Sequence, residues 1–471
     1  MHIIGKYSLF FSIFLLLTAS IRLHAQTQNL SSDTDSFSLQ RIFRDGKLSG
    51  NIRQFNMFTD NAPGLSDYFA VAIGASMRYE TNQWKGVQMV MGGGFVKDIA
   101  SSDFTQPDPV TGAFERYDAG LYELRELDNK GFLPRLEELH LQYRWKRNRL
   151  ILGKQILKTP LANPQDGRMN PSMFDGLYGY LEPSGKIHLE GGWLWNAAPR
   201  STSQWLGTAE SMGIYPQGLT EQGLKSDYHG NISSAGLFVL NLGFSTPVLG
   251  KMAFWDYYIE NVLHTAFFQW EKSFGPAHAA GAPALHAGLM VIRQDAVASG
   301  GNADPLKTYV APGSKSWVVS SYAAWSKEAV RFQLNTTRIT ADGRFLFPRE
   351  WGRDPLFTFL PRERNEGLGD VWAFSGQFTW RPRNSPFSGQ FGMGHYRLPD
   401  VKNYRLNKYG LPSYNQLNMD LKYRFGGRLE GLESQVLIAW KKNAGDLYNN
   451  ERYRINKVDM INYNLVFNYR F

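Results

Sequence analysis

The 471-residue sequence contains no cysteine. This absence excludes a disulfide scaffold, a cysteine-ligated metal site and a thiol nucleophile. The sequence also has no HExxH motif, no GxSxG motif and no Gly-Lys-Ser/Thr phosphate loop. These are the usual signatures of zinc hydrolases, serine hydrolases and nucleotide-binding enzymes. We therefore expect no enzymatic activity, no cofactor and no metal ion.

Long apolar runs are almost absent as well. The single example is Leu9–Ala19, which follows Lys6 and precedes a small residue at Ala25. A helical membrane protein would need repeated runs of about 20 apolar residues. This arrangement instead predicts a secretory signal peptide over residues 1–25, with an uncleaved N-terminal anchor as the alternative.

A concentrated patch of charge is the third missing feature. The chain has 51 basic and 42 acidic residues, and the basic residues are dispersed rather than clustered. Dispersed charge excludes a nucleic-acid-binding protein. The 31 Phe, 23 Tyr and 13 Trp can bury too much surface for a disordered chain. Length alone leaves two or three ordinary domains, or one large β structure, open.

What the sequence does have is alternation of apolar and polar residues. At the C-terminus, six apolar side chains lie two residues apart, at Ile461, Tyr463, Leu465, Phe467, Tyr469 and Phe471. Successive side chains of a strand point to opposite faces, so this segment predicts a strand with one apolar and one polar face. Many such segments span about ten to fourteen residues, close to the length that crosses a bilayer at a tilt.

Eighteen segments show this pattern. They are 47–59, 68–81, 84–95, 135–145, 150–156, 175–181, 187–196, 231–244, 252–260, 262–271, 283–294, 316–325, 330–339, 370–380, 389–397, 413–425, 429–441 and 457–471. Tight turns and long polar loops alternate between most of them. Short turns on one rim and long loops on the other are typical of an outer-membrane β-barrel.

We therefore predict an all-β, up-and-down transmembrane barrel of about 18 antiparallel strands over residues 47–471. Lipid cannot hydrogen-bond the backbone, so a sheet in a membrane has to close on itself. Aromatic residues near strand ends are assigned to the two interfacial girdles: Trp145, Trp380, Trp440, Tyr463 and Tyr469. The predicted location is the bacterial outer membrane.

The segment before the barrel is short. Residues 26–46 are predicted to be a periplasmic N-terminal segment, too short for the globular plug of an energy-coupled transporter. Transport is therefore expected to be passive. A barrel of eighteen strands is also wide enough to hold water.

One stretch resembles a known family. Leu150-Ile-Leu-Gly-Lys-Gln155 leads to Pro160 and then to Arg168-Met-Asn-Pro171-Ser-Met-Phe174-Asp-Gly176. A Gly-x-Gln strand followed by Arg-x-x-Pro-x-x-Phe-x-Gly resembles the OprD family of outer-membrane porins. The resemblance implies an eighteen-stranded channel for small solutes, often with carboxylate groups or basic amino acids, and a lumen lined by arginines. It also implies that the loop in this region folds inward and narrows the pore.

Strand parity nominates residues that line the pore. Inward-facing basic residues are predicted at Arg53, Arg78, Arg144, Arg331, Lys422, Arg424 and Arg470, opposed by Glu138 and Asp420. Arg168 and Asp166 lie in the predicted constriction loop. Rings of Arg or Lys favour anions, and the planar Arg fork suits carboxylates. We expect weak selectivity for anionic solutes, although lumen residues can also be polar merely because they are wet.

The loop over residues 340–369 is unusually rich in arginine. Two hypotheses remain open for its Arg344, Arg349, Arg353, Arg362 and Arg364: binding of lipopolysaccharide phosphates, or a position in a loop that covers the mouth. Expected partners are small hydrophilic solutes, outer-membrane lipid, lipopolysaccharide and further copies of the chain. The alternatives to a porin are a non-conducting adhesin or structural barrel and, less favoured, a barrel hydrolase.

Overall fold

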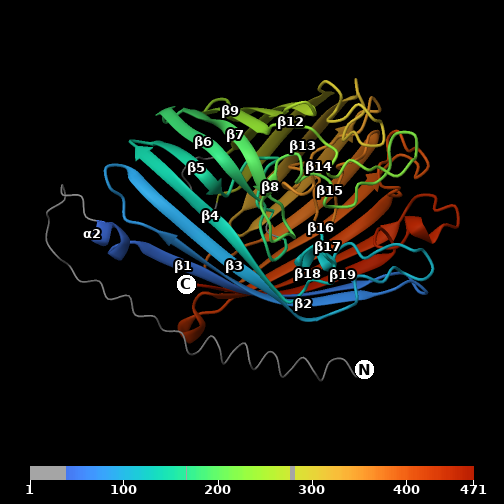
Figure 1. The fold of residues 1–471 in the computed structure, drawn as a ribbon, viewed down its shortest axis with the longest axis horizontal. Helices are drawn as coiled ribbons and strands as arrows, with labels where there is room; N and C mark the ends of the chain where they lie inside the picture. Colours follow the sequence, from blue (N-terminus) through green and yellow to red (C-terminus); the bar gives the residue numbers. More distant parts are fainter. Residues whose placement is uncertain (1–38, 166, 276–281) are drawn as a thin grey trace.

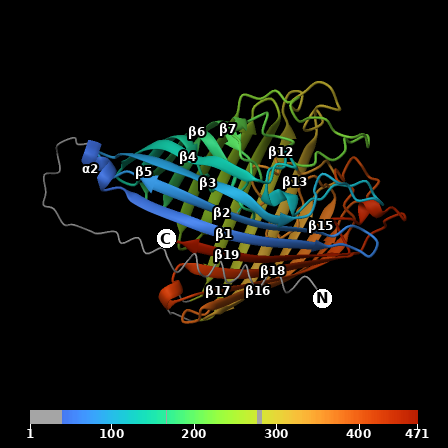
Figure 2. The same cartoon turned by 60° about the horizontal axis from the view of Figure 1, so that its bottom comes forward.

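One antiparallel sheet closes on itself to form a barrel. The computed structural model describes residues 39–165, 167–275 and 282–471. Strand β1 (Lys47–Asp60) pairs with β2 (Tyr68–Glu80) on one side and with β19 (Met460–Arg470) on the other, so the described sheet has no free side edge (Figure 1, Figure 2). The predicted barrel is therefore confirmed.

The remaining strands follow in chain order. They are β3 (Val87–Ser101), β4 (Phe132–Trp145), β5 (Asn148–Gln155), β6 (Met173–Ser184), β7 (Ile187–Ala198), β8 (Leu206–Gly207), β9 (Leu237–Thr246), β10 (Gly250–Ile259), β11 (Leu263–Phe274), β12 (Ala284–Ala296), β13 (Lys315–Lys327), β14 (Val330–Ile339), β15 (Val371–Trp380), β16 (Phe387–Arg397), β17 (Tyr414–Arg424) and β18 (Leu432–Asn443). The described helical segments are α2 (Leu39–Arg44), η1 (Ala119–Leu121), η2 (Gly427–Leu429) and η3 (Glu451–Tyr453).

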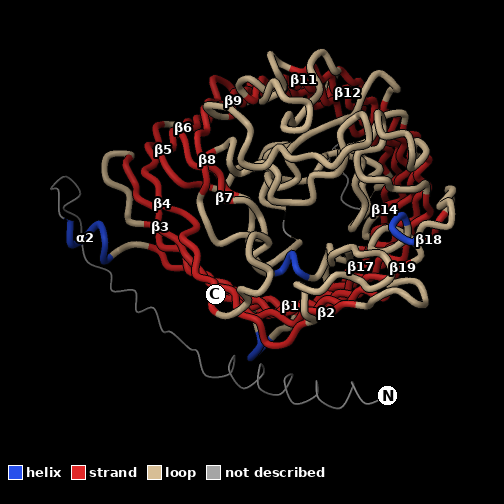
Figure 3. Tube along the Cα trace, turned by 45° about the vertical axis from the view of Figure 1, so that its right-hand side comes forward, coloured by secondary structure: helices blue, strands red, loops and turns tan. Residues whose placement is uncertain are grey.

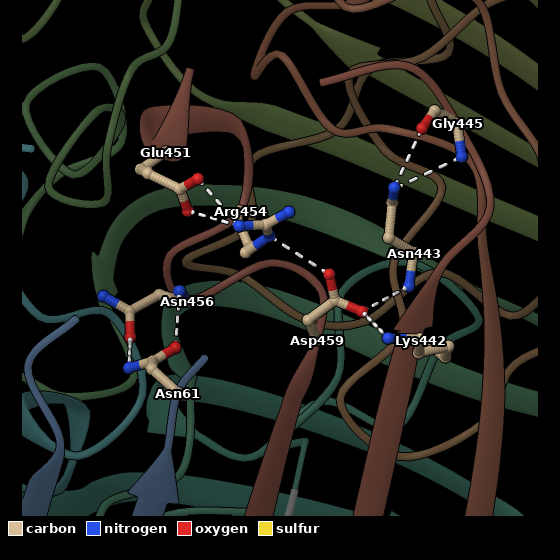
Figure 4. A network of polar contacts seen from close by, with 8 residues as sticks. All are labelled: Asn61, Lys442, Asn443, Gly445, Glu451, Arg454, Asn456 and Asp459. Atoms are coloured by element: carbon tan, nitrogen blue, oxygen red, sulfur yellow. Dashed lines mark hydrogen bonds and ion pairs between the residues drawn. The ribbon is translucent and has the colours of Figure 1, made fainter. Parts of the chain in front are cut away.

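The eighteen long strands correspond one to one with the predicted segments. The differences are at the boundaries: β3 continues to Ser101, β9 begins at Leu237 and β19 begins at Met460. Residues 457–459 belong instead to the preceding loop, where the Asp459 carboxylate binds Lys442 and the Asn443 backbone (Figure 4). Strand β8 and helix α2 were not predicted. Strand β8 is a two-residue strand that pairs antiparallel with the end of β7, at Asn196 and Ala197.

The two rims differ as predicted. One rim carries short connections, such as residues 146–147, 185–186 and 328–329, and the other carries long loops at 102–131, 156–172, 199–236, 340–370 and 444–459. In outer-membrane barrels the short turns face the periplasm and the long loops face outward. We use the terms periplasmic rim and extracellular rim in this sense. Within the described residues, no helix is long and apolar enough to cross a membrane.

The outer wall is apolar. Exposed side chains on its central part include Leu141, Leu152, Leu334, Phe391 and Leu465. The predicted girdle residues Trp380, Trp440 and Tyr463 are exposed on this face too. A closed sheet pairs the backbone N–H and C=O groups of its strands with one another, and the apolar belt presents hydrocarbon to lipid. Both are conditions for crossing a membrane with strands. This chain is accordingly a barrel of the bacterial outer membrane.

Inward-folded loops fill part of the extracellular half of the lumen. Long loops fold into it, as the tan loops inside the ring of strands show (Figure 3). Their apolar residues Leu161, Phe345 and Trp351 join inward wall residues such as Tyr257 and Val318 in one buried cluster. The inward-folded loops therefore narrow the space that a barrel of eighteen strands would leave for water, because they bring their own core with them.

The loops are fastened to one another at Glu350 and Trp351. The Glu350 carboxylate accepts hydrogen bonds from the backbone N–H groups of Gly213 (3.0 Å) and Tyr215 (2.9 Å). The Trp351 indole donates to the Ser211 hydroxyl at 2.8 Å, and its carbonyl accepts from the Asn163 N–H at 3.0 Å. These contacts join the loops at 156–172, 199–236 and 340–370 in a fixed arrangement.

The constriction loop also rests directly on the wall. A Cβ atom on Gly74 of β2 would lie 2.9 Å from the Met169 Cε atom and 2.6 Å from the Phe95 carbonyl oxygen. Only glycine leaves room for that approach. Nearby, the Arg53 guanidinium on β1 donates to the Arg168 carbonyl at 2.7 Å. The predicted inward fold of this loop is thus confirmed, with a packing contact and a hydrogen bond holding it to the wall.

The lipid-facing assignment predicts a clear difference between neighbouring residues of β14. Leu334 points to lipid and is 72% exposed, whereas Gln333 points into the lumen. Leu334→Arg should lower the free energy of unfolding by about 2–4 kcal/mol, the cost of a charge near the bilayer midplane. Gln333→Arg, with its charge in the lumen, should cost much less. Urea titration of barrels folded into vesicles measures both; equal losses would contradict the assignment.

Candidate functional site

A cavity of about 700 Å³ lies between the inward-folded loops and the wall strands β17 and β18. Loops 102–131, 156–172, 199–236 and 340–370 all contribute to its lining. We call it the main cavity. Its size suits a small organic solute with its water, since ligand sites commonly measure about 300–1,000 Å³.

Arginine is the characteristic residue of this cavity. Among the described residues, seven arginines and two lysines line it against three carboxylates, those of Glu115, Glu363 and Asp420. The seven, which we call the arginine cluster, are Arg116, Arg168, Arg200, Arg349, Arg353, Arg362 and Arg364. The excess of positive charge makes the cavity a site that attracts anions.

Aromatic and amide side chains position the guanidinium groups. The guanidinium groups of Arg200 and Arg349 lie 5.1 Å and 5.9 Å from the centre of the Tyr215 ring. The Tyr215 hydroxyl also accepts a hydrogen bond from the Arg200 Nε at 2.7 Å. The Arg362 Nε donates to the Asn462 side chain of β19 at 2.7 Å. Wall and loop contacts of this kind hold like charges close together.

A single amide joins two further members of the cluster. In the orientation that satisfies its neighbours, the Gln165 side-chain oxygen accepts from Arg364 (3.2 Å) and from Arg200 (3.1 Å), while its nitrogen donates to the Gly352 carbonyl (3.0 Å). Gln165 has φ of +44°, an uncommon conformation for a residue with a side chain. The backbone here is held where the amide can serve both guanidiniums.

Several donors of the cluster make no hydrogen bond to the protein. The Nε of Arg168 and the Nε and Nη1 of Arg349 are buried without a hydrogen-bond partner among the described residues, although the Arg349 Nε forms an ion pair with the Glu366 carboxylate at 3.7 Å. A buried donor without a partner costs free energy. If either guanidinium turned toward the cavity, a solute with a carboxylate or another oxyanion would supply the missing acceptors.

The charges of the cluster oppose one another. Burial and then the nearby Arg362 lower the pKa of Arg168 to about 10, and burial likewise lowers the pKa of Arg362 to about 10. Burial, followed by repulsion from Arg349 and Arg200, also lowers the pKa of Arg364. The guanidiniums remain charged at neutral pH, so an entering anion relieves their repulsion.

Two smaller cavities continue from the main one toward the periplasmic rim. A cavity of about 490 Å³ shares Arg168 with the main cavity and follows β1–β4, where Arg53, Arg78, Glu138 and Arg470 line it. We call it the wall cavity. Another, of about 340 Å³, shares Asp420 and Lys422 with the main cavity and includes Arg424. Basic side chains therefore line the cavities from the constriction toward the periplasmic rim.

The structure brings most of the predicted pore residues to these cavities. Arg168, Asp420 and Lys422 line the main cavity, and Arg53 and Glu138 line the wall cavity, where Arg78 binds Glu138 at 2.6 Å. Two predicted residues lie elsewhere: Arg144 is exposed near the periplasmic rim, and Arg331 bonds Gln333 on the inner wall. Asp166 lies outside the described residues.

The arginines of the loop over residues 340–369 fall into two groups. Arg349, Arg353, Arg362 and Arg364 belong to the arginine cluster, inside the barrel. Arg344 instead donates to the carbonyls of Leu219 (2.8 Å) and Thr220 (2.9 Å) and also to that of Tyr404, tying loops together. All five lie within the packed loops, so the hypothesis of a pore-covering loop describes them better than binding of lipopolysaccharide.

Arg116 and Arg200 were not nominated from the sequence. Both lie in long loops without strand periodicity, so parity gives no information about their direction. The only available signal was their position in loops next to the predicted constriction. Among the described residues, no group of three or more His, Cys, Asp or Glu is placed to hold a metal ion.

Comparisons with known proteins give a structural likeness only. No family model matches the sequence, and no curated protein sequence matches it. Solved structures do match: Pseudomonas aeruginosa OpdK with vanillate (TM-score 0.69, 14% identity, 91% of this chain and 99% of that chain) and P. aeruginosa OccK9, or OpdG (0.70, 14%, 91% and 99%). Acinetobacter baumannii OccAB2 is similar too (0.70, 11%, 92% and 99%).

These neighbours share the eighteen-stranded barrel over nearly their whole length. The fold of this chain is therefore that of the OprD and Occ outer-membrane porins, as the resemblance near Arg168 implied. At 11–14% identity the likeness defines the architecture and not the solute.

Tyr117, which lines the main cavity, titrates near neutrality. Burial raises the pKa of Tyr117, but the Lys441 ammonium and the Arg116 and Arg362 guanidiniums outweigh it and lower that pKa to about 8. The phenol is neutral below this value and negative above it, so raising the pH from 7 to 9 adds negative charge beside the arginine cluster.

Anion preference should therefore fall over this pH range, measured as reversal potential across a planar bilayer under a salt gradient. Burial also lowers the pKa of Lys408 to about 8 and that of Lys457 to about 7, so both lose positive charge in the same range. Tyr117→Phe isolates the tyrosine: its pH response should be visibly smaller. A response identical to that of the unmodified protein would remove Tyr117 from the conducting path.

Proposed function

We propose that this chain is a passive diffusion porin for small hydrophilic solutes that favours anionic, carboxylate-bearing ones. The observation that carries the proposal is the lining of the main cavity of about 700 Å³, where the seven arginines of the cluster and two lysines face three carboxylates. Guanidinium groups offer a planar fork that matches a carboxylate, and a narrow basic passage raises the local concentration of anions.

The sequence of cavities supports passage rather than storage. Arg168 borders both the main and the wall cavity, and the wall cavity is lined by further basic residues on the periplasmic side. A solute that leaves the arginine cluster therefore meets new guanidiniums before it gives up the old ones. Conduction requires binding weak or divided enough for the solute to leave.

The shape of the cavity supports a solute with an apolar part. Phe114, Leu124, Leu127, Ile214 and Phe359 line the main cavity beside the charged groups. An aromatic carboxylate fits both surfaces. Among the structural neighbours, OpdK has been solved with vanillate, which is an aromatic carboxylate. We extend that class of solute to this chain as a part of the proposal.

The residues proposed to line the path are Arg168, Arg53, Glu138, Asp420, Lys422 and Arg424, together with the rest of the arginine cluster. Arg144 and Arg331 are given a smaller role because neither lines these cavities. We expect the alternatives, a non-conducting adhesin or structural barrel and a barrel hydrolase, to fail against a direct measurement of ion conductance.

Purified protein should form ion channels in planar bilayers, and insertion without conductance would overturn the porin proposal. Arg168→Ala should change the single-channel current and weaken current block by an aromatic carboxylate by several-fold relative to the matched amide. Arg147→Ala is the control, because Arg147 is exposed in a periplasmic turn. Equal effects of the two substitutions would remove Arg168 from the constriction.

A further inference from the structure

Charged side chains face outward at one end of the lipid-facing wall. They lie on β12–β16 next to the extracellular loops, where the rest of the outer wall gives way to the rim. The side chains concerned, which we call the rim patch, are Arg293, Lys315, Trp317, Arg338, Trp372 and Arg397.

Strand register makes these residues neighbours. Arg293 pairs with Trp317 across β12 and β13, Arg338 pairs with Trp372 across β14 and β15, and Trp372 pairs with Arg397 across β15 and β16. Directly opposed residues of an antiparallel sheet point to the same face. Trp317 and Trp372 are 41% and 42% exposed, which places the shared face on the outside of the barrel.

The guanidiniums lie on aromatic rings. Arg293 stands 5.0 Å from the centre of the Trp317 ring, and Arg338 stands 5.1 Å from that of Trp372. Each also has a carboxylate that fixes its direction: Asp295 bonds the Arg293 Nε at 2.7 Å, and Asp370 binds the Arg338 Nη2 at 2.7 Å. A guanidinium has five N–H donors, so each arginine retains donors for another partner.

Positive charge exceeds negative charge on the patch. Four basic side chains lie near three carboxylates, those of Asp295, Asp370 and Asp342, the last of which interacts electrostatically with Arg293. Neither Lys315 nor Arg397 makes an ion pair with a described residue. Lys442, farther along the same rim, is by contrast neutralised by Asp459 at 2.8 Å (Figure 4). The excess calls for a negatively charged partner outside the protein.

The position identifies the chemistry of that partner. Below the patch on the same strands the outer wall presents Val319, Phe332, Leu334, Phe374 and Met393, all exposed and apolar. Tryptophan with an arginine beside it marks the level of lipid headgroups, where an outward charge costs least. A second copy of the chain would bring a like-charged patch if the two copies met face to face at this surface. A lipid headgroup that carries phosphates matches the positive charge of the rim patch.

We propose that the rim patch binds the phosphate groups of a phosphorylated glycolipid in the outer leaflet. Arg293 and Arg338, already oriented by their aspartates and tryptophans, supply charge-assisted hydrogen bonds, and Lys315 and Arg397 supply unpaired charge. The proposal rests on the outer-membrane location of the barrel but not on conduction. It also assigns lipid binding to wall arginines rather than to the arginines of loop 340–369.

The test compares binding of bisphosphorylated lipid A with binding of the same lipid without its phosphates. Detergent-solubilised full-length barrel is titrated with each lipid and the bound fraction is read by native mass spectrometry. The double variant Arg293→Gln/Arg338→Gln should bind the phosphorylated lipid at least tenfold more weakly. Arg331→Gln, on the inner face of the same strand as Arg338, is the matched control and should bind it like the unmodified protein.

Single-channel conductance of the same preparations keeps this proposal separate from the porin function. The double variant should conduct normally, since neither arginine lines the main cavity or the wall cavity, and normal conductance also shows that it has folded. Unchanged affinity of a conducting double variant, or equal affinity of the unmodified protein for both lipids, would overturn the rim patch. Lack of conductance in the unmodified protein, with selective lipid binding intact, would overturn the porin proposal alone.

Discussion

The proposed channel depends on holding like charges together where they repel one another. Seven guanidiniums share the lining of one cavity, and burial and mutual repulsion lower the pKa of Arg168 and Arg362 to about 10. Such an arrangement persists only if the backbone around it is rigid. That rigidity comes from the contacts of Glu350 and Trp351 between loops, from the contacts of the Tyr215 ring with Arg200 and Arg349, and from the hydrogen bond of Arg362 to the wall residue Asn462. The closed sheet is the frame to which all of them are attached.

The barrel was predictable because its physics repeats along the chain. Each strand must present apolar residues to lipid, so alternation such as that from Ile461 to Phe471 indicates both the strand and its outward face. The eighteen wall strands and the inward direction of Arg53, Lys422 and Glu138 follow from this one rule. Boundaries were less certain, as at Leu237 and Met460, because loop residues next to a strand can continue the same polarity without joining the sheet.

The constriction was only partly predictable, because loops have no period. Arg168 was found through a resemblance, whereas Arg116 and Arg200 carry no sequence signal that separates them from exposed loop residues. The lack of a period in loops also explains why the packed part of the lumen was not predicted. Alternation predicts polar inward faces, yet Tyr257 and Val318 are inward and apolar, since the inward-folded loops cover them. Side-chain direction in a loop is decided by tertiary contacts such as that between Trp351 and Ser211.

The central claim is that the arginine cluster sorts solutes by charge, and uptake into proteoliposomes tests it most directly. Three aromatic solutes of equal size are compared, with a carboxylate, an amide or an amine at the same position. The account predicts fastest entry for the carboxylate and slowest for the amine, with the difference reduced in Arg168→Ala/Arg362→Ala. Equal rates for the three solutes, or fastest entry of the amine, would contradict it.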